Sequence, residues 1–122
     1  MTITLEEIQQ THIILCEDAL KLVMKKGLDY NRRQQDEGDT LFNLRVSRIL
    51  GVVETDEASI LVRMTDKLMR LISLTAPKEI PKPACNDEKV EDTVKDMINY
   101  TVYLYAVHRK RLEETMLREM TG

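Results

Sequence analysis

Residues 87–100 read DEKVEDTVKDMINY, a stretch with the periodicity of one long helix. At 3.6 residues per turn, positions 88, 92, 96 and 99 fall on a single face. That face carries Glu88, Asp92 and Asp96, whereas the opposite face consists of Val90, Val94, Met97 and Thr101. Like charges four residues apart destabilise an isolated helix by roughly 0.2 to 0.5 kcal/mol per pair. A cation or a positively charged partner would compensate for this repulsion.

Outward from this segment, the remaining sequence also predicts helices. A Thr4–Glu7 capping box opens a helix over residues 5–26, which Gly27 is expected to close. Residues 28–39 lack apolar periodicity and are predicted to form a long surface loop. A short helix is expected from Asp39 or Thr40 to the glycine at position 51.

Thr55 is the expected cap of the next helix, which must end before Pro77. Its predicted buried stripe consists of Leu61, Met64, Leu68 and Leu71 or Ile72. The proline-rich residues 77–83 predict a stiff connection, after which Asn86 caps a last helix over residues 87–119. The residues expected to face inward on that helix are Val90, Val94, Met97, Thr101, Leu104 and Leu112.

The predicted fold is therefore all-α. It is a bundle of about four main helices, with a short helix and a long surface loop between the first and the third. The 122 residues are expected to form a single domain, since this is an ordinary domain size. One alternative is a strand over residues 98–107, where Tyr, Val and Thr favour sheets.

Composition limits the partners and the location. The net charge of −3 and the pI near 5.4 provide no basic stripe for duplex nucleic acid. No apolar run approaches the roughly 20 residues of a membrane span, and the first residues lack the Lys or Arg of a secretory signal. Cys16 and Cys85 are too far apart for a metal knuckle and fit reduced thiols. We expect a cytoplasmic protein, in the host cytoplasm if a phage encodes it.

The acidic row could bind a hard cation. Magnesium prefers carboxylate oxygens and can bridge them to phosphate. Asp92 and Asp96 lie one turn apart, and Asp66 on the preceding helix is the best third ligand, with Glu17 a weaker fourth. The same helix offers Arg63, Lys67 and Arg70 as phosphate contacts. A metal held by Asp96 could orient a water molecule, with Glu91 or Glu88 as the base.

Structural explanations for these residues remain open. Acids in a first turn stabilise the helix dipole by about 0.3 to 1 kcal/mol, which alone would account for Asp87, Glu88 and Glu91. Asp66 between two arginines could form a solvated ion-pair ladder. The tyrosines at 100, 103 and 105 fit a core or an interface, although one could stack on a base. His12 and His108 have no partner recognisable from the sequence.

Four ordered segments of the sequence resemble the nucleotide modification associated domain family of bacteriophages and bacteria. They are a Lys and Asp-Tyr element followed by the strings LFNLRVSRILG, ILVRMTDKLMRL and NDEKVEDTVKDMINY. The resemblance covers roughly residues 20–107. The residues that match its four ordered motifs are Lys26, Asp29 and Tyr30; Phe42 and Asn43; Arg63, Asp66, Lys67 and Arg70; and Asp87, Glu88, Asp92, Thr93, Asp96, Asn99 and Tyr100. It implies a role in phage nucleotide metabolism or nucleotide recognition. Lys26, Tyr30, Asn43, Asn99 and Tyr100 would then join the three cations of residues 63–70 in ligand binding.

The sequence also looks like a distant relation of the all-α MazG-type nucleoside triphosphate pyrophosphohydrolases, which place acidic clusters around magnesium. The helix with Asp66 has no second acid on the same face, as those enzymes would require. Two function classes stay open: a magnesium-dependent nucleotide pyrophosphohydrolase, and a binder that sequesters a nucleotide immune signal without hydrolysis and so counters antiviral defence. A helical interaction protein without a small ligand is a third option.

Small size and a long last helix also predict a homodimer or higher oligomer.

Overall fold

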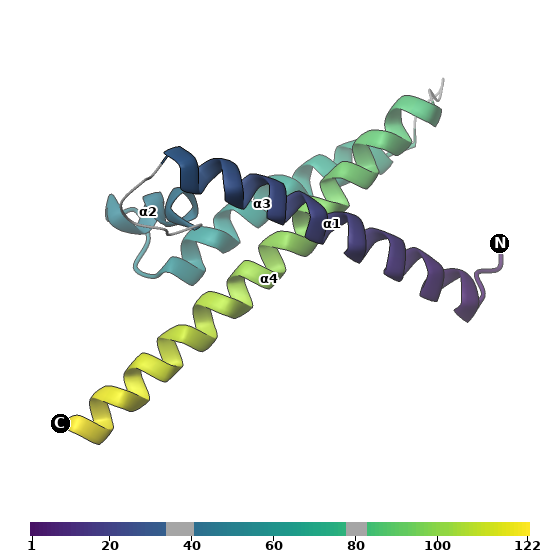
Figure 1. Cartoon of the computed structure of the whole chain (residues 1–122). Coiled ribbons are helices and arrows are strands. Elements are labelled where there is room, and N and C mark those ends of the chain that lie inside the picture. Colours follow the sequence, from purple (N-terminus) through teal and green to yellow (C-terminus); the bar gives the residue numbers. More distant parts are fainter. Residues whose placement is uncertain (34–40, 78–82) are drawn as a thin grey trace.

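The computed structural model describes residues 1–33, 41–77 and 83–122, and for residues 26–33 and 83–88 it describes the backbone alone. Its α-helices are α1 (Leu5–Arg33), α2 (Val46–Ile49), α3 (Asp56–Thr75) and α4 (Pro83–Thr121), and a 3-10 helix, η1 (Phe42–Arg45), precedes α2. Within those described ranges there is no strand, so the predicted all-α fold is confirmed and residues 98–107 are helical. Figure 1 shows α3 and α4 running side by side, with α1 crossing α4.

The start of α1 follows the predicted capping box. The Thr4 backbone N–H donates to Glu7 Oε2 and the Glu7 N–H donates to Thr4 Oγ1, both at 3.1 Å. The predicted end at Gly27 is wrong, because α1 continues to Arg33. A glycine inside a helix costs only about 1 kcal/mol relative to alanine, and the residues that follow it include good helix formers. Part of the predicted loop is therefore helix, while residues 34–40, including the expected cap at Asp39 or Thr40, lie outside the described chain.

The connection from α2 to α3 is set by local backbone chemistry. Gly51 adopts a φ of 78°, a left-handed conformation that glycine reaches without steric cost. Thr55 then caps α3, since its Oγ1 accepts the Ala58 N–H at 3.0 Å. Both positions were predicted from the sequence and are confirmed.

A small core lies where η1, α3 and α4 meet. Its buried apolar residues are Leu44, Ile60 and Val107, with Leu41, Met64, Tyr100, Tyr103 and Leu104 packed around them. The Ser59 hydroxyl donates to the Leu44 carbonyl and so ties η1 to α3. Tyr100 and Tyr103 meet edge to face, with ring centroids 6.2 Å apart. These two tyrosines thus belong to the core, as one interpretation of the sequence proposed.

The buried face of α3 differs from the predicted stripe. Leu61, Leu68 and Ile72 are exposed, whereas Ile60 is fully buried and Met64 and Leu71 are half-buried. The sequence analysis placed Leu61 on the buried face instead of Ile60, because both residues are apolar and helical periodicity alone does not distinguish them. Which of these two residues is buried depends on the position of α4 against α3, and tertiary packing sets that position.

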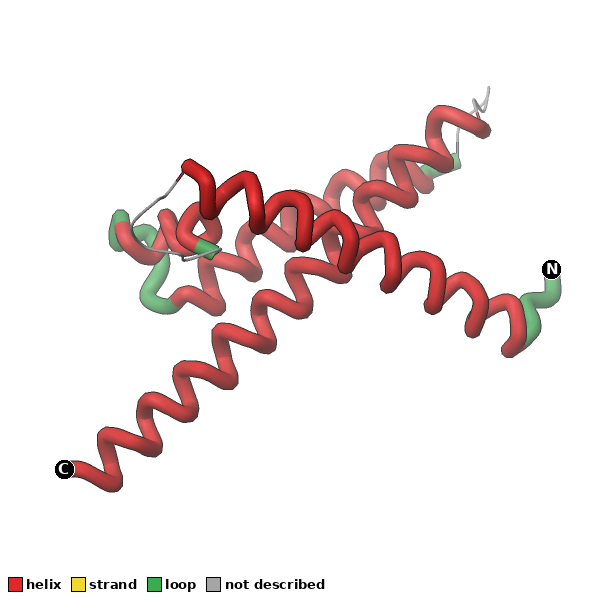
Figure 2. The backbone as a smooth tube through the Cα atoms, in the orientation of Figure 1, coloured by secondary structure: helices red, strands yellow, loops and turns green. Residues whose placement is uncertain are grey.

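The last helix is also longer than predicted. It begins at Pro83, a residue suited to the first helical position, and the expected cap Asn86 therefore lies inside the helix. Of the residues expected to face inward, Thr101 and Leu112 are exposed, while Val90, Val94, Met97 and Leu104 are half-buried. The second half of α4 extends away from the core as a single helix, and the first half of α1 extends in a different direction (Figure 2).

Candidate functional site

Most of the polar residues predicted to bind a ligand lie on α3 and the first half of α4, whereas Lys26 and Tyr30 lie on α1 and Asn43 lies on η1. Helices α3 and α4 are antiparallel, so the middle of α3 faces the acidic row of α4. Here Lys67 Nζ and Asp96 Oδ2 form an ion pair at 3.1 Å. Both side chains are about three-quarters buried, which shields the pair from solvent more than a surface ion pair. The structure thus brings one predicted phosphate contact together with one predicted metal ligand.

Two arginines flank Lys67 on α3. Arg63 lies four residues before it and Arg70 three residues after it, a spacing that places all three on adjoining turns of the helix. Both arginines are exposed, and neither has a hydrogen bond or ion pair with another described residue. The three cations cover about 10 Å along the helix axis. This face, residues 63–70 of α3 with Asp96, is called the α3 cationic face below.

The predicted magnesium ligands do not assemble in the same way. Asp66 and Asp92 are exposed, and Asp96 is engaged by the Lys67 ammonium. Among the side chains that the structure describes, no three of His, Cys, Asp or Glu form a group that could hold a metal ion. The carboxylates that the structure describes therefore do not come together as the three-carboxylate magnesium site expected from the sequence. Glu17, the weaker fourth candidate, is exposed on α1.

Glu91, the predicted base, lies in a different ion-pair group. Lys95 Nζ lies 3.4 Å from Glu91 Oε1 and 3.7 Å from Asp18 Oδ2. Lys95 of α4 therefore contacts both Glu91 on its own helix and Asp18 on α1. This group stabilises the crossing of the two helices, and the predicted role of Glu91 in catalysis stays a prediction.

Asn99 also contributes to the contact between α1 and α4. Its side chain is 7% exposed, and its Nδ2 donates to the Ala19 carbonyl at 3.1 Å. Ala19 is itself buried, because α1 and α4 approach each other closely there. The amide of Asn99 is thus used between helices, while Tyr100, next to it, lies against the core. Asn43 is exposed on η1, and the side chains of Lys26 and Tyr30 lie outside the described residues, as do those of Asp87 and Glu88.

A buried carboxylate that the sequence analysis missed connects the start of α3 to α4. Glu57 is 9% exposed, and its Oε2 lies 2.7 Å from Arg111 Nη2 and 3.2 Å from His108 Nδ1. His108 therefore has a partner, contrary to the sequence interpretation. His12 has one as well, since its Nδ1 lies 3.5 Å from Cys16 Sγ. A glutamate in the first turn of a helix is commonly exposed, so no local pattern marked Glu57 as buried.

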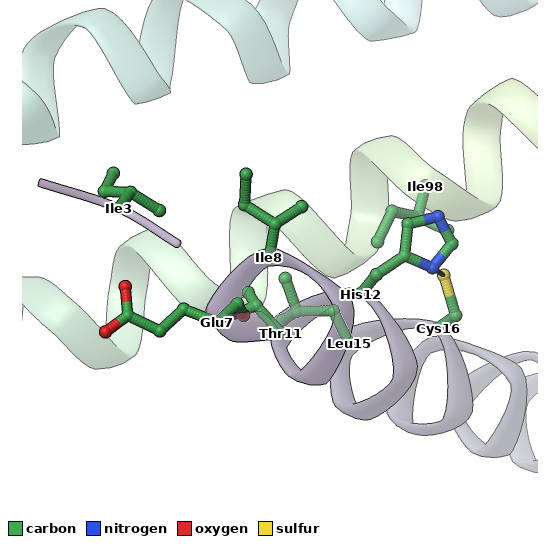
Figure 3. Close-up of a pocket in the computed structure, with 8 residues that line it drawn as sticks. All are labelled: Ile3, Glu7, Ile8, Thr11, His12, Leu15, Cys16 and Ile98. Carbon is green, nitrogen blue, oxygen red and sulfur yellow. Dashed lines mark hydrogen bonds between the residues drawn. The ribbon is translucent and has the colours of Figure 1, made fainter. Parts of the chain in front are cut away.

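Of the hollows that the structure describes away from the α3 cationic face, two could accept a partner or a ligand. One has a volume of about 370 Å³ and is lined by Arg45, Asp56, Val107, Lys110, Arg111, Glu114, Thr115 and Arg118. The other is an apolar groove of about 570 Å³ between the first half of α1 and α4, and its lining residues are Ile3, Glu7, Ile8, Thr11, His12, Leu15, Cys16 and Ile98 (Figure 3). The first is rich in cations and the second is suited to an apolar side chain.

These contacts define an all-α protein built on a long antiparallel helix pair, with a cationic face on α3 and acidic side chains on α4. No family, curated protein or solved structure matches this chain. Of the helices described, none has both the length and the apolar character needed to cross a membrane.

Proposed function

We propose that this chain binds a phosphorylated nucleotide at the α3 cationic face. The observation that carries the proposal is the Lys67–Asp96 ion pair between two exposed arginines. Arginine presents a planar fork of donors that matches phosphate oxygens, and lysine adds a point charge. The resemblance of these positions to the nucleotide modification associated domain motifs supports the same ligand class.

Asp96 has a defined role in this proposal. Its carboxylate neutralises Lys67 and holds the lysine in place while no ligand is present. A phosphate that reaches Lys67 has to compete with this carboxylate. Removing the negative charge at position 96 should therefore strengthen phosphate binding, provided that no metal ion uses Asp96.

The alternative within the same proposal is hydrolysis. A magnesium ion that arrives with the nucleotide could be held by one or two carboxylates and the phosphates, which is a common arrangement for this ion. Asp92 and Asp96 would then be its protein ligands, and the chain would be a nucleotide pyrophosphohydrolase. Without turnover, the chain would sequester a nucleotide, such as a signal used in antiviral defence.

The test is direct binding to a panel of nucleotides, with magnesium and with EDTA, followed by analysis of the nucleotide recovered after heat denaturation. Product indicates the hydrolase, and intact nucleotide indicates sequestration. Arg63→Ala and Arg70→Ala should each weaken binding about tenfold or more, since a hydrogen bond to a charged group contributes roughly 1.5 to 3 kcal/mol. Arg118→Ala, an exposed arginine at the far end of α4, is the matched control. Equal losses in all three variants would contradict a site on α3.

Asp96→Asn separates the two classes. It should raise affinity in a binder that uses Lys67 on phosphate, and it should abolish cleavage in a hydrolase that uses Asp96 on magnesium. Full turnover in this variant would exclude the ligand role of Asp96. Binding of no nucleotide by the native chain would leave only the interaction-protein interpretation.

We also propose that the chain forms a homo-oligomer. The support for this is the amount of apolar side chain that α1, α3 and α4 leave exposed. Exposed apolar residues in this quantity are typical of interaction surfaces.

A further inference from the structure

The isolated chain exposes more surface than a compact protein of its size. Its accessible surface is 9798 Å² for a mass of 14.2 kDa. A folded monomer of this mass is expected to expose about 6,800 Å². The excess of about 3,000 Å² per chain, or about 6,000 Å² for two chains, is more than enough for a permanent dimer, since such dimers bury about 2,000 to 5,000 Å² or more in total.

Much of this surface belongs to two helical arms. The N-terminal arm is residues 3–16, which comprise the two residues before α1 and its first three turns, and the C-terminal arm is residues 108–121, the end of α4. The two arms leave the centre of the molecule in different directions (Figure 1). Each exposes large apolar side chains, with Leu5 and Met120 both 81% exposed.

The C-terminal arm has a continuous apolar stripe. Leu112, Met116 and Met120 recur every four residues, so they lie on one side of the helix. Leu117 widens this stripe by one position, and all four side chains are exposed. An exposed apolar stripe on a single helix is typical of a surface that packs against another helix.

The N-terminal arm lines an apolar groove that is suited to bind such a stripe. Ile3, Ile8 and Leu15 of this arm, with Ile98 of α4, line the 570 Å³ apolar groove. In Figure 3, the side chains of Ile8 and His12 project from the same side of α1, and the His12 ring lies next to Ile98 on the neighbouring helix. A groove with walls from two helices is a shape that accepts the apolar face of a third.

The two arms have net charges of opposite sign. The first 20 residues contain Glu6, Glu7, Glu17 and Asp18 and no Lys or Arg. The C-terminal arm contains Arg109, Lys110, Arg111 and Arg118 together with Glu113, Glu114 and Glu119, so its net charge is +1. Glu7 lies in the wall of the groove itself. Opposite charges at the edge of an apolar contact favour one register and one partner.

We infer that the chain forms a two-fold symmetric dimer in which the C-terminal arm of each copy occupies the apolar groove of the other. The occupant is a second copy because this one chain carries both the groove and a stripe of matching character and charge. Reciprocal exchange satisfies both surfaces in a closed pair, as two-fold symmetry requires. The inference is independent of nucleotide binding.

The first experiment measures the mass of the native full-length chain and of three variants by light scattering after size exclusion. The native chain should have a mass of about 28 kDa, twice the 14.2 kDa of one copy. Ile8→Glu in the groove and Met116→Glu in the stripe should each yield monomers. Leu68→Glu, at an equally exposed apolar position of α3, is the matched control and should remain dimeric. Because all three side chains are exposed, helicity measured by circular dichroism should be retained.

The second experiment mixes the Ile8→Glu and Met116→Glu variants in equal amounts. If the arms exchange, a mixed pair contains one contact in which the native groove meets the native stripe. The mixture should therefore recover a dimer that neither variant forms alone. If like arms met instead, each contact would contain one altered arm and mixing would restore nothing.

Several results would overturn the inference. These are a monomeric native chain, a dimer that survives both arm substitutions, loss of the dimer in Leu68→Glu, and a mixture that stays monomeric. A series of masses rising with concentration would also overturn it, because arms that pair without closing would produce open chains.

Discussion

At Asn99, one side-chain amide joins two helices through a hydrogen bond to Ala19, a residue 80 positions earlier in the chain. The amide is buried at the crossing of α1 and α4 and donates to the Ala19 carbonyl. A buried donor loses its water on folding, so its hydrogen bond within the protein has to replace that interaction. The residue thus fixes where α1 crosses α4, whether or not it also contacts a ligand.

Asn99→Ala should lower the free energy of unfolding by about 1 to 2 kcal/mol, because the interhelical hydrogen bond is lost and a small void replaces the amide. Urea denaturation at one fixed protein concentration measures the change. Asn43→Ala, at an exposed asparagine, is the control and should change stability by less than about 0.5 kcal/mol. Equal effects at the two positions would contradict the structural role of Asn99.

At the scale of elements, the starts of α1 and α3 and the turn at Gly51 were predicted more accurately than the buried faces. The capping box of α1, the Thr55 cap of α3 and the turn at Gly51 depend on residues close in sequence, and the structure confirms all three. The continuation of α1 beyond Gly27 was missed because a glycine inside a helix is a small cost that its neighbours can offset. Local patterns therefore locate an element better than they determine its length.

Thr55→Ala should destabilise the protein by about 1 kcal/mol, since the Ala58 N–H loses its acceptor at the start of α3. Thr55→Ser keeps the hydroxyl and should retain most of the stability. Thermal unfolding followed by circular dichroism compares the two. A serine variant as unstable as the alanine variant would show that the methyl group, and not the hydrogen bond, is the important part.

At the scale of the whole molecule, a single chain has a small core for its length. The buried apolar side chains cluster where η1, α3 and α4 meet, and the ends of α1 and α4 lie beyond that cluster. Each core residue therefore accounts for a large share of the stability of the isolated fold. Association of two copies would bury the surface that one copy leaves exposed.

Ile60→Ala should lower the free energy of unfolding by about 2 to 5 kcal/mol, because Ile60 is fully buried and the substitution leaves a cavity. Ile72→Ala on the same helix is the control, since Ile72 is 56% exposed and its loss should cost less than about 1 kcal/mol. Chemical denaturation of the two variants measures the difference. Comparable losses would place Ile72 in a buried contact of an oligomer.

The sequence alone determined that this protein is helical, that α1 and α3 are capped at Thr4 and Thr55, and that Arg63, Lys67 and Arg70 share one side of a helix. These properties depend on residues within a few turns of one another, where spacing and capping chemistry are sufficient. Only the tertiary structure decided that Ile60 and not Leu61 is buried, that Asp96 meets Lys67, and that Asn99 and Glu57 are buried. Those outcomes depend on which helix packs against each of these side chains. The periodic pattern of one helix contains no information about which other helix packs against it.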